Sequence, residues 1–402
     1  MSTATARAFD PLWDSLVDIG RDQRTGGYRR FAWTPADLGC REWFEAQAAG
    51  RGLDLTVDRD GNQWAWWGDP DAHGPGVVTG SHLDSVPDGG AYDGPLGVVS
   101  GFAALDLLRA RGRRPRRPIG IVCFADEEGA RFGVACAGSR LLTGALPPAR
   151  ARGLTDVDGI TLAQAMRGAG HDPSGLGPDP EALRRVGVLV ELHVEQGRGL
   201  ADLAAAVGVA SGIWPHGRWR FDFAGRADHA GTTRLADRHD PMLPFARTVL
   251  AARVAAERHG ALATFGRVLA EPNATNAVPA RVTGWLDARA PDEWRARAVV
   301  ADLTSESGGR VREESWTPVV TFDEPLRERI ATVVGGPSGL APALTTGAGH
   351  DAGVLAAAGV PAAMLFVRNP TGVSHSPAEH AETADCLVGV SALADTLERL
   401  VS

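Results

Sequence analysis

Residue types that bind metal ions follow four short apolar runs of this sequence. The polar segments are GSHLDSVPDGGAYDG (80–94), FADEEGARFG (124–133), ELHVEQG (191–197) and GVSHSPAEH (372–380). The runs that precede them are short and partly β-branched, which is typical of buried parallel strands. Open α/β sheets build their active sites at the carboxyl ends of such strands. We therefore expect the four segments to meet at one edge of a sheet.

Together the segments offer imidazole and carboxylate ligands but no thiolate, a set that suits zinc, manganese, cobalt or nickel in a catalytic site. His82, Asp93 and His193 would hold one ion. Glu128 and His375 would hold a second ion together with Asp93, which would bridge the two. Ions bridged in this way would lie about 3.5–4 Å apart and would activate a shared water as hydroxide near neutral pH. The pattern predicts two divalent ions per chain.

Two glutamates stand side by side in the second segment. Neighbouring residues at a strand end point in different directions, so Glu128 can bind metal while Glu127 carries a proton. Asp84, two residues after His82, is placed to accept the second ring N–H of that histidine. A single histidine after a strand is more often structural, and a lone glutamate pair is typical of a solvated helix start. Five candidate ligands together favour the catalytic interpretation.

In this order the segments resemble the dinuclear metal amidohydrolases that include N-carbamoyl-L-amino-acid hydrolases and allantoate amidohydrolases. Aminoacylases and metal carboxypeptidases are more distant relatives. The similarity covers almost the whole chain and includes DHAGTTR (228–234), NATNAVPARVTGWLDAR (273–289) and GAGHDA (347–352). The motifs GGAYDG, EEGARF, HVEQG and HAGTT are typical of the ureido-cleaving branch. Within GAGHDA, His350 and Asp351 fit either a site or a helix cap.

The resemblance also implies residues that handle the substrate. His229 would reach into the partner subunit's site and stabilise the oxyanion, while Asn276 and Arg289 would hold the substrate carboxylate. A guanidinium fork suits a carboxylate, although an arginine at a strand end is more often a surface ion pair. Gln196 offers an amide donor and acceptor either to a ureido group or to nearby backbone groups.

Two positions depart from the family pattern. Arg234 follows HAGTT where the family usually has proline, and Arg368 with Asn369 replaces a usual Pro-Ser pair. An extra cation beside the substrate favours an acidic or doubly polar molecule, unless these arginines face solvent. Allantoate is therefore the first choice of substrate, and an N-carbamoyl-L-amino acid is the alternative.

Apolar periodicity and the resemblance divide the chain into two parts. Residues 1–210 and 324–402 would form an α/β catalytic domain, with a mostly parallel central sheet flanked by helices. Residues 211–323 have a βαββαβ-like order, which resembles the inserted lid and dimerisation domain of the family. The segments 208–212 and 322–325 would be the hinges. A homodimer with composite sites follows from this resemblance.

Composition limits the other classes. A chain of 402 residues with 44% apolar content can bury two cores. Its net charge of −8 argues against nucleic-acid binding, although arginines crowd residues 109–117. Four scattered cysteines form no CxxC pair and suggest neither a disulfide framework nor a zinc knot. No apolar signal core and no run near 18 apolar residues is present, so we expect neither export nor membrane insertion but a cytoplasmic protein.

These features predict a hydrolase that cleaves the ureido C–N bond of a carboxylate-bearing small molecule. A dipeptidase or aminoacylase would use the same metal centre. A serine hydrolase around Ser81 or Ser374 is a weaker alternative, because the chain has no GxSxG elbow. A binding module is weaker still, since Glu127 would serve no purpose in it.

Overall fold

The computed structural model describes residues 3–336 and 339–402. The chain forms two compact units. The first comprises Met1–Ser211 and Thr321–Ser402, and the second comprises Gly212–Val320. No helix in the described part of the chain is long and apolar enough to cross a membrane.

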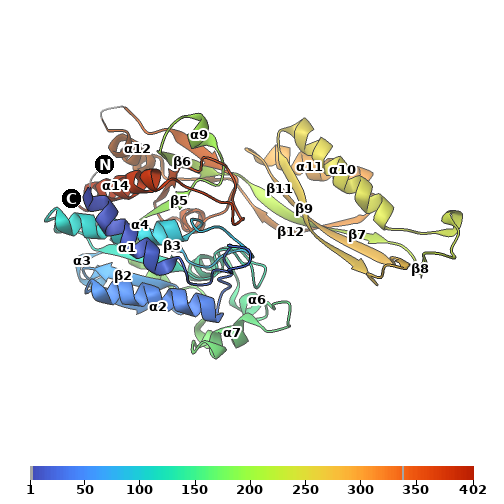
Figure 1. The fold of residues 1–402 in the computed structure, drawn as a ribbon, viewed down its shortest axis with the longest axis horizontal. Coiled ribbons are helices and arrows are strands. Elements are labelled where there is room, and N and C mark those ends of the chain that lie inside the picture. Colours follow the sequence, from blue (N-terminus) through green and yellow to red (C-terminus); the bar gives the residue numbers. More distant parts are fainter. Residues whose placement is uncertain (1–2, 337–338) are drawn as a thin grey trace. The chain divides into compact units, whose positions relative to one another are not determined.

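A nine-stranded mixed sheet forms the centre of the first unit (Figure 1). Its strands run in the order β1 (Asp54–Val57), β2 (Gln63–Trp67), β4 (Ile119–Phe124), β3 (Gly76–His82), β5 (Val186–Val194), β15 (Ala362–Val367), β6 (Val207–Ile213) and β13 (Val320–Thr321), and β14 (Ala343–Thr346) pairs with β6. The neighbours β4, β3, β5 and β15 are parallel. The pairs β1–β2, β2–β4 and β15–β6 are antiparallel. The expected α/β class is confirmed, with a mixed rather than mostly parallel sheet.

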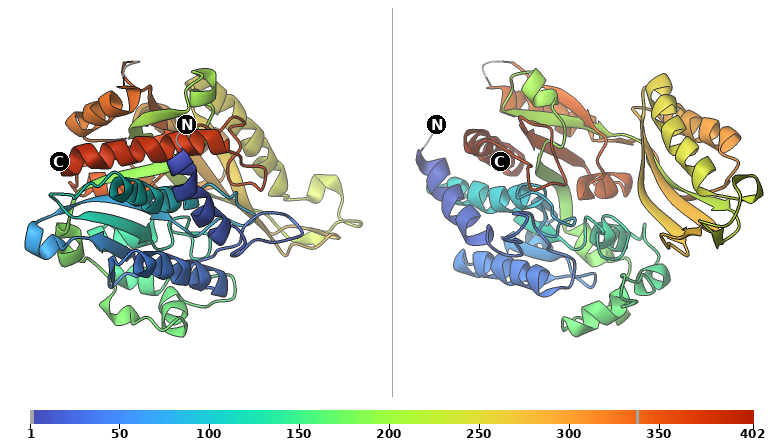
Figure 2. Two further views of the ribbon diagram at one scale, coloured as in Figure 1. Left: turned by 60° about the vertical axis from the view of Figure 1, so that its left-hand side comes forward. Right: turned by 45° about the vertical axis from the view of Figure 1, so that its right-hand side comes forward.

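Helices cover both faces of this sheet (Figure 2). The helices are α1 (Thr3–Leu16), α2 (Pro35–Gly50), α3 (Pro70–His73), α4 (Pro95–Ala110), α5 (Ala137–Thr143), α6 (Pro148–Arg152), α7 (Leu162–Gly168), α8 (Pro180–Arg184), α9 (Gly199–Asp202), α12 (Glu324–Gly335), α13 (Asp351–Ala357) and α14 (Thr383–Val401). Strand residues alternate between the faces, so Val77 and Leu365 join the core beneath α1, α4 and α14. Phe366, the next residue after Leu365, faces the ring of His350 beside α13.

The second unit is a four-stranded antiparallel sheet with two helices on one face (Figure 2). The strand order is β12 (Arg310–Thr317), β7 (His216–Ala224), β11 (Arg281–Arg289) and β9 (Leu262–Glu271). The helices are α10 (Met242–His259) and α11 (Glu293–Glu306), and β8 (Asp228–His229) pairs with β10 (Ala277–Val278). Along β7, alternate residues are buried against these helices, as the pattern WRFDF predicts.

Residues 208–212, expected as a hinge where the inserted domain begins, lie within β6, and the two units divide at Ser211 and Gly212. Close packing explains one glycine, because a Cβ on Gly208 would come within 2.8 Å of the side chains of Leu344 and Leu200. At the other expected hinge, Phe322 is buried and the carboxylate of Asp323 caps the start of α12.

Candidate metal centre

Parallel neighbouring strands bring the four ligand-bearing segments to one edge of the sheet. His82 is the last residue of β3, and His193 is the penultimate residue of β5. Glu127 and Glu128 follow the end of β4, and His375 lies in the loop after β15. This arrangement is the one expected for polar residues placed at the carboxyl ends of parallel strands.

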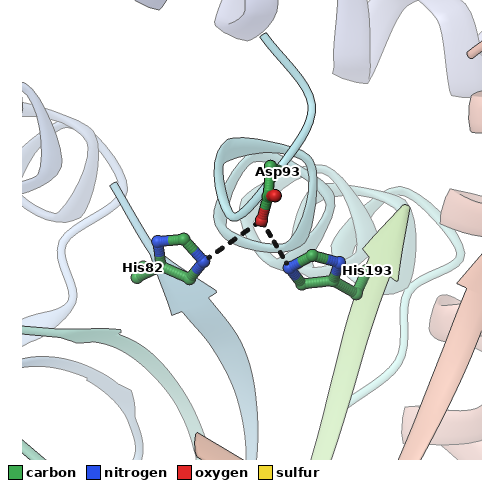
Figure 3. Close-up of side chains that lie close together, drawn as sticks. All are labelled: His82, Asp93 and His193. Atoms are coloured by element: carbon green, nitrogen blue, oxygen red, sulfur yellow. Dashed lines mark ion pairs between the residues drawn. The ribbon is translucent and has the colours of Figure 1, made fainter. Parts of the chain in front are cut away.

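His82, Asp93 and His193 form a compact buried group (Figure 3). Asp93 Oδ1 lies 3.6 Å from His82 Nε2 and 3.2 Å from His193 Nε2. Burial opposes the charge of Asp93, but His193 and His82 hold the pKa of its carboxyl well below the usual value. The three ligand atoms therefore face one another in a space that favours a cation.

The hydrogen bonds of the two histidines fit this interpretation. His82 Nδ1 lies 3.1 Å from the carbonyl oxygen of Asp84, and His193 Nδ1 lies 2.9 Å from that of Val194. A carbonyl only accepts, so each Nδ1 carries hydrogen and Nε2 keeps the lone pair when the ring is neutral. Both Nε2 atoms are buried without a hydrogen-bond partner among the described residues. Lone pairs and a carboxylate that converge in a buried space suit a divalent metal ion.

The other oxygen of Asp93 faces a second group. Its Oδ2 lies 3.4 Å from His375 Nε2, and Glu128 Oε2 lies 3.6 Å from the same nitrogen. Asp93, Glu128 and His375 have ligand atoms close enough for one ion. The amide of Gln196 also lies here, because its Nε2 donates to Asp93 Oδ2 at 2.9 Å. Asp93 is thus positioned between two potential ion sites.

Glu127 faces His82 of the first group. Its Oε2 lies 3.7 Å from His82 Nε2. Burial raises the pKa of Glu127 well above the usual value, although His82 opposes the shift. Asp84 holds both glutamates in place, since its two carboxylate oxygens accept the backbone N–H groups of Glu127 and Glu128 at 3.1 and 3.0 Å. Asp84 Oδ1 also lies 3.4 Å from His82 Nδ1.

A glycine after Asp93 allows this close assembly. Gly94 has φ +86°, and a Cβ added there would come within 2.5 Å of the His82 ring. Only glycine combines this backbone conformation with the required space. Pro95 then begins α4 at a position where its missing N–H costs nothing.

Glu379 was not among the residues predicted for the site. This buried carboxylate accepts the backbone N–H of Asp93 at 3.0 Å through Oε1, and Oε2 accepts the hydroxyl of Ser374 at 3.1 Å. It therefore connects the loop of the bridging ligand to the loop of His375. In the sequence, Glu379 is only an acidic residue four positions after His375. Its contact with Asp93, 286 residues earlier, has no local signal.

His229 and Asn276 lie together in the second unit. His229 pairs with Ala277 between β8 and β10, and the carbonyl of Asn276 accepts the N–H of Ala230 at 2.9 Å. The N–H of Gly231 donates to His229 Nδ1 at 3.0 Å, so a neutral His229 ring carries its hydrogen on Nε2. Both side chains belong to exposed residues.

Arg289 lies at the end of β11, where it pairs with His216. Its Nε and Nη2 donate to the carboxylate of Asp287 at 2.6 and 3.0 Å, which orients the guanidinium. Arg289 and Asp287 are half-buried.

Arg368 does not have the environment expected of a substrate ligand. Its Nε and Nη2 donate to Asp385 at 2.7 and 3.0 Å, and Asp385 is buried on α14. The guanidinium of Arg368 is thus paired with Asp385, and a contact with substrate stays a prediction. Arg234 is exposed and precedes a short 3-10 turn in the second unit.

His350 lies beside His193 of the candidate centre, and Asp351 is the next residue along the chain. The His350 ring is 4.5 Å from that of His193, and it makes no capping hydrogen bond to α13. Asp351 accepts the hydroxyl of Ser139, and burial raises its pKa to about 8. Glu191 Oε2 accepts the N–H of Ala352 in the first turn of α13 at 3.0 Å. His350 is therefore not a side-chain cap.

Comparison with known proteins identifies the family of this chain. Residues 78–399 match the model of peptidase family M20/M25/M40. The chain is 36% identical to an N-carbamoyl-L-amino acid amidohydrolase of Geobacillus stearothermophilus, over 97% of this chain and 98% of the relative. It is 30% identical to an allantoate amidohydrolase of Escherichia coli, over 100% and 99%.

Among solved structures, a hydantoinase/carbamoylase family amidase of Burkholderia vietnamiensis superposes with a TM-score of 0.90. The two share 28% identity, over 99% of this chain and 97% of that structure. The chain belongs to peptidase family M20/M25/M40. The resemblance to amidohydrolases of this family is confirmed.

Proposed function

We propose that the protein is a metal-dependent hydrolase of the ureido C–N bond in a small molecule that carries a carboxylate. The observation that carries this proposal is the position of Asp93 between two ligand groups, with Glu127 beside them. Full-length relatives named for ureido substrates support the reaction class.

His82, Asp93 and His193 would hold one ion, and Asp93, Glu128 and His375 would hold the second. Zinc, manganese, cobalt and nickel all suit this donor set. When bound, such ions lower the pKa of a water molecule and polarise the carbonyl that it attacks. The proposal therefore assigns the remaining work, which is proton transfer and substrate positioning, to other side chains.

Glu127 would move the proton. It would accept a proton from the water that attacks the carbamoyl carbon and donate that proton to the leaving nitrogen as the C–N bond breaks. Its burial suits this role, because a raised pKa makes Glu127 a stronger base toward the proton of the water. The carbamate product would then decompose to ammonia and carbon dioxide.

The second unit would supply the groups that read the substrate. His229 offers an Nε2–H donor for the developing oxyanion. Arg289 offers a guanidinium, oriented by Asp287, for the carboxylate. However, the segment that leads to His229 pairs with the start of β11, whereas Arg289 lies at the end of that strand. We propose that His229 and Asn276 serve a second copy of the chain, whereas Arg289 serves its own.

An unpaired strand edge and exposed apolar side chains in the second unit support a homodimer. Strand β9 is an edge of the four-stranded sheet and exposes Leu262, Val268 and Leu269. On α10, which packs beside β9, Leu250 is 71% exposed and Val254 is 54% exposed. Edges of this kind are usually covered, and a second copy of β9 could extend the sheet.

The environment of Arg368 changes which ureido acid we propose to test first. The preference for allantoate depended on Arg234 and Arg368, and Arg368 is bound to Asp385. An N-carbamoyl-L-amino acid is therefore the first substrate to test, and allantoate is the second. Gln196 is the candidate for the ureido group, because its Nε2 already lies beside Asp93.

Product analysis distinguishes this function from that of a peptidase. Metal-loaded protein should release ammonia from N-carbamoyl-L-amino acids or allantoate faster than it releases amine from matched dipeptides or N-acetyl amino acids. The opposite preference would identify an aminoacylase or dipeptidase with the same metal ligands.

A further inference from the structure

Cys136 contacts the proposed proton carrier directly. Its Sγ lies 3.3 Å from Glu127 Oε1, while the other oxygen of Glu127 lies 3.7 Å from His82 Nε2. Both Cys136 and Glu127 are buried. One carboxylate oxygen therefore faces the thiol and the other faces the metal ligands.

We propose that Cys136 is a positioning residue, whose thiol donates a hydrogen bond to Glu127 Oε1 and keeps Oε2 directed at the reacting atoms. The inference rests on the proposed function, in which Glu127 transfers the proton. The carboxylate can rotate about its side-chain torsions, so a fixed contact on one oxygen restricts where the other can lie.

The backbone places the thiol rigidly. The N–H groups of Cys136, Ala137 and Gly138 donate to the carbonyls of Glu127, Asp126 and Ala125 in turn. Cys136 has φ +53°, a left-handed conformation that is unusual for a residue other than glycine. The segment 136–138 thus runs alongside the segment of the two glutamates and holds the sulfur against Glu127.

The thiol is a donor in this contact. Burial raises the pKa of Cys136 well above the usual value, and the neighbouring Glu127 raises it further, so the sulfur keeps its hydrogen. An S–H group donates weakly, and a carboxylate is an acceptor with two oxygens. Buried cysteines often only fill space, and the experiment must separate these two roles.

Cys123 provides a matched control. It is also a buried free cysteine, and it lies on β4 just before the glutamates. Its Sγ lies 3.9 Å from the carbonyl oxygen of Phe124. Cys123→Ala and Cys136→Ala thus delete the same buried atom, and only the second deletion removes a contact to Glu127.

The first measurement compares metal-loaded Cys136→Ala, Cys136→Ser and Cys123→Ala with the wild type on an N-carbamoyl-L-amino acid. Cys136→Ala should lower kcat roughly tenfold with little change in KM, as expected for one lost hydrogen bond to a charged group. Cys136→Ser should retain kcat within about threefold, because a hydroxyl also donates. Cys123→Ala should keep kcat, and all variants should keep the ion content of the wild type.

The role is refuted if Cys136→Ala and Cys123→Ala lower kcat equally, if Cys136→Ser falls as far as Cys136→Ala, or if the loss follows loss of metal. If the wild type hydrolyses no ureido acid, that result refutes the proposed function but does not test the Cys136 contact. An infrared measurement without substrate then tests the contact. The S–H stretching band that Cys136→Ala removes should lie at lower frequency than the band that Cys123→Ala removes, and Glu127→Gln should shift it. A Cys136 band at the Cys123 frequency, unmoved by Glu127→Gln, overturns the proposal.

Discussion

Arg289 ends β11 of the second unit, whereas His229 lies in the separate two-stranded pairing of β8 with β10. Arg281 at the start of β11 pairs with Ala224, four residues before β8, whereas Arg289 pairs with His216 at the start of β7. Arg289 lies eight residues after Arg281, which is about 27 Å along the strand at 3.4 Å per residue. Because this length far exceeds the size of a small ureido acid, we propose that His229 and Arg289 of one chain serve different sites.

Mixed dimers should reveal this division. His229→Ala and Arg289→Ala should each be nearly inactive alone, yet subunit exchange between them should restore activity to about a quarter of the wild type, because random pairing leaves that share of sites complete. Ammonia release after exchange measures the recovery. The control mixture of His229→Ala with Asn276→Ala should stay inactive, since both residues lie at the same end. Failure of the first mixture despite proven exchange would mean that His229 and Arg289 of the same chain complete one site.

Substitutions of the two adjacent glutamates should distinguish metal binding from proton transfer. Glu127→Gln should keep both ions and lower kcat by about 10²–10⁴-fold, because only the proton carrier is lost. Glu128→Gln should instead lose metal, since it removes a ligand beside His375. Elemental analysis together with kinetics checks both results. Loss of metal in Glu127→Gln would mean that the two roles are reversed.

Asp60 should make the stability of the protein depend on pH. Burial raises its pKa to about 8, whereas an unfolded aspartate has a pKa near 3.9. The folded state holds a proton that the unfolded state releases, so this group lowers the free energy of unfolding as pH rises from about 4 to 8. Asp60→Asn should therefore raise Tm relative to the wild type by a few degrees more at pH 8 than at pH 5.

The amide can still accept the N–H of Gly177, which Asp60 Oδ1 accepts at 2.9 Å. Asp158→Asn, at an exposed carboxyl, is the control and should leave Tm unchanged at both pH values. An Asp60→Asn effect of equal size at pH 5 and pH 8 would show that Asp60 is ionised in the fold.

The clustering of the candidate ligands could be predicted because these residues follow strands whose apolar runs are visible in the sequence. His82 and His193 end neighbouring parallel strands, so local patterns were sufficient to bring them together. The antiparallel edge of the sheet was not predictable in the same way. Strand β6 lies where a hinge was expected from the domain insertion, and its pairing with β15 depends on residues more than 150 positions away.

Contacts distant in sequence explain the remaining differences. Arg368 was predicted to bind substrate, and the structure shows that its guanidinium donates to Asp385 on α14. Glu379 and Cys136 escaped notice because neither has a local signature, and each acts through a partner that the fold supplies. Periodicity identifies which face a residue occupies, but it does not identify the side chain that it meets there.

The most direct test of the account is a metal titration of ion-free protein with an N-carbamoyl-L-amino acid present. The protein is first freed of metal with a chelator and dialysed, and its ion content is measured at each addition of zinc, manganese, cobalt or nickel. We predict no ammonia release without metal, and turnover that rises with bound ions and reaches its maximum near two per chain. Full ammonia release from protein shown to contain no metal would contradict the account.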